Sequence, residues 1–185
     1  EEGIRDRLVT GVQTCALPIY FIIATGSSSM ERPGITVDEK KIVTSTGALS
    51  LSAVPKTMLV IGGGYIGLEM GSVWSRLGTK VTVVEKLDRI VPTMDGEIAT
   101  EFMKSLEKQG LEFKLSHKVV ATKSGSKDVE VTMESEQDKK QVKDKFNVVL
   151  MSIGRKPNTE ELNLEKIGVK LNDQQAIDVD QQYKT

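Results

Sequence analysis

The chain has 185 residues, of which 38% are hydrophobic and 28% are charged, and its formal net charge is -1. This length accommodates one domain with additional segments, because domains commonly run to about 100–200 residues. The near-neutral charge lacks the basic excess of nucleic-acid-binding surfaces, and no apolar run approaches the roughly 18 residues of a membrane span. A lone cysteine, Cys15, and a lone histidine, His117, exclude an internal disulfide and argue against a Cys/His metal site. The composition therefore predicts a soluble globular protein without metal, nucleic-acid partner or membrane span.

The first nineteen residues do not resemble part of a folded domain. They read EEGIRDRLVTGVQTCALPI and show neither the apolar core of a signal peptide nor the acid-poor amphipathic pattern of a transit peptide. The run resembles the in-frame translation of a sequencing-library adapter, so we expect residues 1–19 to be a disordered artefact. A genuine disordered terminus is the alternative. Under either interpretation Cys15 carries no chemistry. As an artefact, the run places the start of the biological sequence near Tyr20, so we expect the true N-terminus and any targeting signal to be missing and the localisation to be unreadable from the residues.

The next thirty residues read as a strand, a loop and a short helix. Tyr20 to Ala24 (YFIIA) is apolar, aromatic and β-branched and predicts a buried strand that feeds a tight turn at Thr25-Gly26-Ser27. The stretch SSSMERPGI predicts a loop, and residues 46–51 predict one helical turn after a Ser/Thr cap. This region is typical of a connection between domains.

A regular strand, helix, strand pattern begins at Thr57. The run MLVI is continuous and apolar, as in a central parallel strand covered on both faces. A glycine-rich turn follows, and then apolar residues recur at helical spacing up to a glycine suited to a left-handed cap: Ile66, Met70, Val73, Leu77 and Gly78. Residues 80–85 (KVTVVE) predict the second strand, so residues 57–85 predict one crossover unit.

The second half predicts a helix followed by several strands. Asp95 is a candidate N-cap for a helix that places Ile98, Phe102 and Leu106 on one face and ends at Gly110. The stretches 111–115, 129–134 and 142–153 alternate or run apolar, and the last two predict an antiparallel meander. Residues 148–151 predict a return to the central sheet, RKPNTEELN a loop, and the tail from residue 172 at most one short strand around residues 177–179.

The glycine-rich turn carries the chemistry. Residues 62–67 read GGGYIG, a GxGxxG sequence that follows a predicted strand, opens a predicted helix and is trailed 18 residues later by Glu85 at the end of the next strand. These are the three features of the dinucleotide fingerprint. The alternative is a simple strand-to-helix turn, in which the glycines serve only the backbone.

Each position of this fingerprint has a physical reason. Gly62 permits the tight turn, Gly64 lets the backbone approach a pyrophosphate, and Gly67 lets helix and strand pack closely. The N–H groups at the helix start favour phosphates. Glu85 accepts hydrogen bonds from ribose hydroxyls and repels a 2′-phosphate, so NAD is preferred to NADP. Lys86 beside it weakens that preference, and a solvated strand end is the alternative for Glu85.

Other polar and aromatic residues near this unit have simpler explanations. Glu69 fits a cofactor role or the helix dipole in the first turn equally well. His117 is expected to end a strand or face water, since no carboxylate or nucleophile partners it. Tyr65 and Trp74 are expected to pack. No residue of the chain is predicted to be catalytic.

Five stretches together resemble a known family. In chain order they are IIATGS, KIVTSTGALSL, IGGGYIGLEMGSVWSRLGTKVTVVE, LEKQGLEFKL and IGRKPNTEELNLEKIGV. From Tyr20 to Thr185 the chain resembles the dihydrolipoamide dehydrogenase family of class I pyridine nucleotide-disulfide oxidoreductases. The resemblance implies an α/β fold, with a Rossmann-like NAD-binding domain that has a central parallel sheet and an antiparallel β-meander. It assigns residues 20–50 to the tail of an FAD-binding domain and a connection, 51–168 to the NAD-binding domain, and 169–185 to a return to the FAD-binding domain.

The resemblance also implies which residues bind the two cofactors. It places an FAD contact on Ala24, Thr25, Gly26 and Ser27. It places NAD contacts on the turn and helix start, on the ribose-binding acid and on two later positions: Gly62, Gly63, Gly64, Tyr65, Ile66, Gly67, Leu68, Glu69, Glu85, Val119 and Gly154. Glu69 matches a glutamate near flavin and nicotinamide that pairs with a lysine outside this chain. Tyr65 stands where this family commonly has valine and resembles the gating tyrosine of glutathione reductases.

In this family, two electrons pass from dihydrolipoamide to a redox disulfide, then to FAD, and then as hydride to NAD. The resemblance implies a homodimer that serves the acyltransferase component of a 2-oxoacid dehydrogenase complex, in the mitochondrial matrix or the bacterial cytoplasm. The chain lacks the redox cysteines, so we expect it to be an incomplete, inactive piece. The alternatives are an NADH oxidase, a coenzyme A or thiol disulfide reductase of the same architecture, and a non-catalytic nucleotide-binding module.

Overall fold

The computed structural model describes residues 20–185, so the adapter prediction for residues 1–19 lies outside the described part of the chain. The helices are α1 Ser45–Leu49, α2 Tyr65–Arg76, α3 Gly96–Lys108 and the 3-10 turn η1 Leu164–Ile167. The strands are β1 Ser27–Ser29, β2 Ile42–Val43, β3 Thr57–Ile61, β4 Lys80–Val84, β5 Glu112–Lys114, β6 His117–Ser124, β7 Val129–Ser135, β8 Gln141–Phe146, β9 Val148–Met151 and β10 Arg155–Pro157.

A parallel five-stranded sheet forms the centre of the molecule, in the order β2-β9-β3-β4-β5. β3 pairs with β4 on one side and with β9 on the other, both in parallel. α2 connects β3 to β4, which confirms the predicted crossover unit. The apolar run at residues 148–151 returns to the sheet as β9, as its composition predicts.

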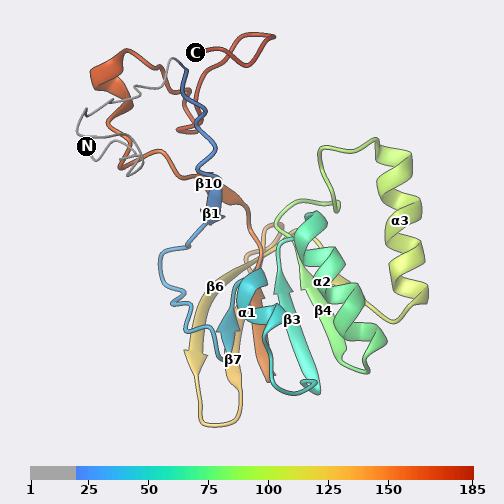
Figure 1. Ribbon diagram of the computed structural model, residues 1–185. Helices are drawn as coiled ribbons and strands as arrows, with labels where there is room; N and C mark the ends of the chain where they lie inside the picture. The colour runs from blue at the N-terminus through green and yellow to red at the C-terminus, as the bar shows by residue number, and fades with distance from the viewer. Residues whose placement is uncertain (1–19) are drawn as a thin grey trace, which may run out of the picture.

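Two buried clusters hold the layers together, one on each face of this sheet. Side chains alternate along a strand, so Met58 and Val60 of β3 enter the cluster with the helices, and Leu59 and Ile61 enter the cluster with the meander. α1, α2 and α3 contribute buried residues to the first cluster, whereas β6 and β7 contribute to the second. Figure 1 shows the helices and the meander on opposite sides of the sheet. This arrangement confirms the predicted fold class.

α2 packs on the sheet through two glycines and two large apolar residues. An added Cβ on Gly71 would lie 3.3 Å from the Val81 side chain, so this face of the helix approaches the strands closely. The buried positions are Gly67, Leu68, Gly71 and Trp74. The predicted apolar face is wrong at Val73 and Leu77, which are 48% and 55% exposed, whereas Met70 is partly buried against the first cluster.

α3 begins where the sequence predicts, but its buried face differs. The Asp95 carboxylate accepts hydrogen bonds from the N–H groups of Glu97 at 2.9 Å and Ile98 at 3.3 Å, which confirms the cap. Leu106 is buried with Ala99, while Ile98 and Phe102 are 60% and 39% exposed. The helix thus packs through a narrow edge, and the predicted face is correct only at Leu106.

The predicted strand at Tyr20–Ala24 does not form. Tyr20, Phe21 and Ile22 are 89%, 80% and 93% exposed, and no strand among the described residues pairs with them. Instead, β1 pairs antiparallel with β10, although both segments were predicted as loops. Figure 1 shows this two-stranded ribbon at the junction between the layered body and the C-terminal coil. The tail contains one isolated bridge, Leu171 to Ile177, in agreement with the single short strand predicted there.

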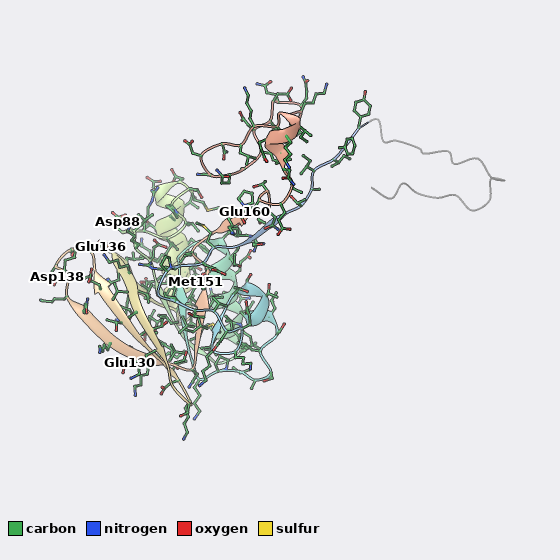
Figure 2. All side chains as sticks on the ribbon, turned by 90° about the vertical axis from the view of Figure 1, so that its left-hand side faces the viewer. Asp88, Glu130, Glu136, Asp138, Met151 and Glu160 are labelled. Carbon is green, nitrogen blue, oxygen red and sulfur yellow. The ribbon has the colours of Figure 1, made fainter. Side chains whose placement is uncertain are left out.

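The meander carries a network of ion pairs on its polar face. The Lys118 ammonium lies 3.1 Å from a Glu134 oxygen and 3.2 Å from a Glu136 oxygen, and Lys139 lies 2.7 Å from Glu136. Hydrogen bonds from Lys139, which has the larger effect, and from Lys118 lower the pKa of the Glu136 carboxyl to about 2. Figure 2 labels Glu130, Glu136 and Asp138 on this part of the molecule.

Candidate nucleotide-binding site

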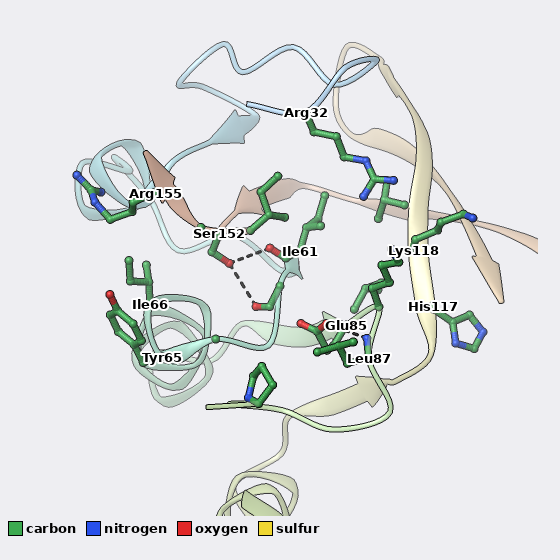
Figure 3. A pocket seen from close by; sticks show the side chains of 18 residues that line it. Arg32, Ile61, Tyr65, Ile66, Glu85, Leu87, His117, Lys118, Ser152 and Arg155 are labelled. Carbon is green, nitrogen blue, oxygen red and sulfur yellow. Dashed lines mark hydrogen bonds between the residues drawn. The ribbon is translucent and has the colours of Figure 1, made fainter. Parts of the chain in front are cut away.

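A cavity of about 590 Å³ opens at the carboxyl ends of β3, β4 and β9. In open parallel sheets ligands bind at this edge, beyond the ends of the strands. The cavity is drawn in Figure 3, and its lining residues are Arg32, Ile61, Gly62, Gly64, Tyr65, Ile66, Val84, Glu85, Lys86, Leu87, Pro92, His117, Lys118, Val119, Ser152, Ile153, Gly154 and Arg155. The strand order thus brings β3, β4, β6 and β9, which are distant in sequence, to one site.

The first and third glycines of the turn are required by packing. Gly62 has a φ of +107°, and an added Cβ would lie 2.5 Å from the Ser152 carbonyl oxygen. An added Cβ on Gly67 would lie 2.4 Å from the Gly62 carbonyl oxygen and 2.6 Å from the Ser152 hydroxyl. Real side chains do not tolerate such approaches, so both positions keep α2 close to β3.

The middle glycine has a different environment. An added Cβ on Gly64 would meet nothing within 4 Å, so the backbone there borders open space in the cavity. Gly64 is the N-cap of α2 and supplies no side-chain hydrogen bond to the first turn. The N–H groups of that turn are therefore free to bind an anion, and the helix dipole favours negative charge there. This cradle fits the diphosphate of a dinucleotide.

Glu85 is fixed at the cavity wall by the backbone. Its Oε2 accepts a hydrogen bond from the Gly63 N–H at 2.7 Å, and its Oε1 accepts one from the Leu87 N–H at 2.9 Å. Figure 3 labels Glu85 and Leu87 side by side at the cavity. A carboxylate oxygen has two acceptor positions. Each oxygen therefore retains capacity for a ribose hydroxyl.

Four of the described residues that line the cavity are Lys or Arg. Glu85 is the only Asp or Glu in the same lining. Lys86 is evident beside Glu85 in sequence, whereas Arg32, Lys118 and Arg155 were not predicted and reach the cavity through the fold. Lys118 is held by Glu134 and Glu136 at 3.1 and 3.2 Å. No strand was predicted at β6, and no sequence signal links Lys118 or Arg32 to the glycine turn.

Ser152 is a further residue that the sequence analysis missed. It follows β9, and its hydroxyl donates to the Ile61 carbonyl at 2.9 Å, with the Gly62 carbonyl 3.4 Å away. Its backbone N–H also donates to the Ile61 carbonyl at 2.9 Å. Ser152 therefore orients the carbonyl groups that precede the glycine turn.

Of the remaining residues predicted to contact NAD, some line the cavity and others do not. Val119 and Gly154 line the cavity with Tyr65 and Ile66, whereas Gly63, Gly67, Leu68 and Glu69 do not. Glu69 is exposed in the second turn of α2, and the first turn holds no acid, so its assignment to the first-turn dipole is wrong.

Tyr65 and His117 both line the cavity. Tyr65 is 67% exposed, so the expectation that it packs is wrong. His117 begins β6, and its Nδ1 lies 2.6 Å from the Leu115 carbonyl oxygen.

The predicted FAD contact lies outside this cavity, next to β1. Thr25 and Gly26 are exposed, and the turn is tied to Asn158. The Asn158 amide donates to the Thr25 carbonyl at 3.0 Å, and its N–H donates to the Gly26 carbonyl at 3.0 Å. Arg155 donates to the Ser27 hydroxyl at 2.7 Å, so one cavity residue also contacts the turn.

Two kinds of feature are absent from the described chain. Residues 20–185 contain no group of three or more His, Cys, Asp or Glu placed to hold a metal ion. Across the same range, the helices are too short or too polar to span a bilayer.

Comparison with known proteins decides the family. Pyridine nucleotide-disulphide oxidoreductase is the family whose pattern matches residues 17–185. The chain belongs to that family. The chain is 51% identical over 177 residues to the mitochondrial dihydrolipoyl dehydrogenase of Pisum sativum, and this match covers 96% of the chain and 35% of the relative. It is 56% identical over 162 residues to dihydrolipoyl dehydrogenase 1, mitochondrial, of Arabidopsis thaliana, covering 88% of the chain and 32% of the relative.

A solved structure agrees with the family. The HOCl-induced flavoprotein disulfide reductase RclA from Escherichia coli matches with a TM-score of 0.73 and 30% identity, over 85% of the chain and 35% of RclA. The chain therefore spans about a third of the length of these curated relatives and of this solved structure.

Proposed function

We propose that the cavity binds NAD and that the chain is the NAD-binding part of a dihydrolipoamide dehydrogenase. The observation that carries this proposal is the open backbone at Gly64 beside the fixed carboxylate of Glu85. The first feature accepts a diphosphate and the second selects an unphosphorylated ribose. The relatives named dihydrolipoyl dehydrogenase, at 51% and 56% identity, support the enzyme class over the RclA-like reductase at 30%.

The chain's residues bind and orient the cofactor. The helix start at Gly64, Tyr65 and Ile66 holds the diphosphate, Glu85 accepts the ribose hydroxyls, and Val119 and Gly154 contact the dinucleotide further along the cavity. When bound, NAD supplies the hydride acceptor of the family's reaction. Gly63, Gly67 and Leu68 act through the packing of the turn and helix. Glu69 is proposed to lie toward the nicotinamide from the exposed side of α2.

The second cofactor is proposed to contact this chain at Ala24, Thr25, Gly26 and Ser27. The turn is held by Asn158 and by Arg155, which gives it a defined position next to the nucleotide cavity. When bound, FAD supplies the redox group between disulfide and NAD.

The proposed domain division follows from these contacts. Residues 51–168 hold four of the five strands of the parallel sheet, most of both buried clusters and every cavity residue except Arg32, and we propose that they form the NAD-binding domain. Residues 20–50 and 169–185 are proposed to belong to the FAD-binding domain and its connection. The exposure of Tyr20, Phe21 and Ile22 supports this division, because a strand with this composition normally has a sheet to pair with.

The whole protein's substrate, partners and location are proposed from the relatives. Dihydrolipoamide carried by the acyltransferase component of a 2-oxoacid dehydrogenase complex is the proposed substrate, and a homodimer the proposed assembly. Several relatives carry the word mitochondrial in their names, and this supports the mitochondrial matrix over the bacterial cytoplasm. An assay of dihydrolipoamide-dependent NAD⁺ reduction by the complete enzyme tests the substrate, and no turnover would refute it.

Cofactor titration of the 185-residue chain tests the proposed site. We predict tighter binding of NADH than of NADPH, followed by the fluorescence of the bound reduced cofactor. Glu85→Ala is expected to reduce this preference by roughly tenfold, since hydrogen bonds to a charged group contribute about 1.5–3 kcal/mol. Glu107→Ala, an exposed glutamate on α3, is the matched control and leaves the preference unchanged. Equal affinity of the unmodified chain for both cofactors would refute the proposal.

A further inference from the structure

One cationic side chain enters the cavity from outside the strand, helix, strand unit. Arg32 lies in the segment that precedes β2, and within residues 20–185 it is the only cavity residue before β3. Figure 3 places its guanidinium over the cavity, on the side away from Tyr65 and next to Lys118. Its origin in a distant segment explains why the glycine fingerprint gives no sign of it.

A short, anchored turn holds Arg32 in place. The Ile35 N–H donates to the Arg32 carbonyl at 3.1 Å, and the two residues form an antiparallel bridge across Gly34, whose φ is +85°. Ile35 is 6% exposed and belongs to the same buried cluster as Val119. The turn is thus fixed to the layer that forms one wall of the cavity.

Arg32 is more available to a ligand than two of the other cavity cations. Lys118 is paired with two glutamates, and Arg155 is hydrogen-bonded to Ser27. Within residues 20–185 Arg32 has no ion-pair partner. Lys86 is next to Glu85 in sequence, on the ribose side of the cavity.

Aliphatic side chains make up an apolar part of the cavity wall. Ile61, Val84, Val119 and Ile153 line the cavity, and Val119 is fully buried. The diphosphate is already accommodated at the start of α2. A planar guanidinium above an apolar wall is suited to a planar base, because arginine stacks on aromatic faces.

We propose that Arg32 binds the adenine ring of the dinucleotide, stacking on its outer face while the apolar wall covers the inner face. This assignment rests on the proposed NAD site and adds a residue to its adenosine half. Arg32 therefore contributes to affinity for any ligand that carries adenosine, and it does not contact the nicotinamide half.

Ligands that divide the dinucleotide test this assignment. Calorimetric titration of the 185-residue chain uses NADH, AMP and reduced nicotinamide mononucleotide, with Arg32→Ala, Arg32→Lys and the control Arg76→Ala. Arg76 lies at the far end of α2, where it donates to Gln109 at 3.2 Å. Arg32→Ala is expected to weaken NADH and AMP binding about fivefold and to leave the mononucleotide unchanged, because one such contact contributes about 0.5–2 kcal/mol.

The outcomes separate this inference from the proposed function. No NADH binding by the unmodified chain refutes the NAD site itself. Normal NADH binding with undiminished AMP affinity in Arg32→Ala overturns only the role of Arg32. Equal loss for AMP and the mononucleotide, or full recovery by Arg32→Lys, assigns the effect to charge and also overturns stacking. A melting temperature within about 2 °C of the unmodified chain shows that the variant is folded.

Discussion

Gly64 and Gly67 are three residues apart, yet the structure gives them opposite roles. Gly67 is confined by the Gly62 carbonyl oxygen and the Ser152 hydroxyl, whereas Gly64 borders open space. The same added methyl group therefore meets the protein itself at one position and only a ligand at the other. This contrast separates what glycine does for packing from what it does for binding.

We predict that Gly67→Ala destabilises the fold and that Gly64→Ala spares it. Overpacking costs about 1–3 kcal/mol or more, so Gly67→Ala is expected to lower the melting temperature by several degrees. Gly64→Ala changes only an N-cap, at a cost of about 1 kcal/mol or less. It is expected to weaken NADH binding about tenfold or more, the equivalent of about 1.4 kcal/mol. Thermal melting and NADH titration measure the two effects, and normal NADH affinity in Gly64→Ala would contradict the cradle.

Among the elements, the meander combines an apolar face with a charged face. The apolar face covers the sheet, and the polar face carries the Lys118 network that joins β6 to β7 and the following turn. The lowered pKa of Glu136 shows that its charged form is favoured by folding. The network therefore makes stability depend on pH.

Glu136→Gln is predicted to lower the melting temperature at pH 7, and the deficit is predicted to shrink in acid. The pKa of Glu136 is about 2 in the folded protein and 4.5 as the reference value. A depressed folded-state pKa gives stability that is present above 4.5 and is lost as the pH falls through about 2. Melting curves at pH 7 and pH 3 measure this change, with Glu107→Gln as the control. A deficit that stays constant with pH would mean that the carboxylate charge is not involved.

Local sequence patterns predicted where helices and strands form more accurately than which of their side chains are buried. The crossover unit from Thr57, the Asp95 cap and the meander follow from signals within a few residues and are confirmed. The buried face of α2 was mispredicted because hydrophobic size pointed to Val73, whereas the close approach to the sheet requires glycine. Apolar periodicity does not record which side of a helix needs small residues.

Contacts between distant segments explain the other differences. β1 and β10 pair across more than 120 residues of sequence, and their serine, arginine and lysine side chains give no strand signal. The strand predicted at Tyr20–Ala24 has the composition of a strand but finds no partner among residues 20–185. For the site, the glycine turn and Glu85 were evident in sequence, whereas Arg32 and Ser152 reach the cavity only through the fold.

At the scale of the whole molecule, a layered body adjoins an extended segment with exposed apolar side chains. Tyr20, Phe21 and Ile22 lie beyond the β1–β10 ribbon and belong to neither buried cluster. Contiguous exposed apolar residues with strand composition promote association between chains. The body does not depend on them for its own packing.

Replacing Phe21 and Ile22 by serine is predicted to reduce aggregation of the 185-residue chain without altering its body. The double variant is expected to keep the melting temperature within about 2 °C, since exposed substitutions usually change stability by less than about 0.5 kcal/mol. NADH affinity is expected to stay the same. Light scattering against concentration measures the association, and Leu49→Ser, at an exposed leucine in α1, is the comparison. A cooperative loss of stability in the double variant would show that these residues pack on the body.

Arg155 touches two regions at once, since it lines the cavity and its guanidinium donates to Ser27. A molecule that enters the cavity and draws this guanidinium toward itself would release the hydroxyl of Ser27. Binding at the sheet edge would then change the hydrogen bonding of the neighbouring turn through the Arg155 side chain, without movement of the strands. Amide hydrogen exchange at Ser27 and Ser28, with and without NADH, would register this transmission, and Arg155→Ala is expected to abolish it.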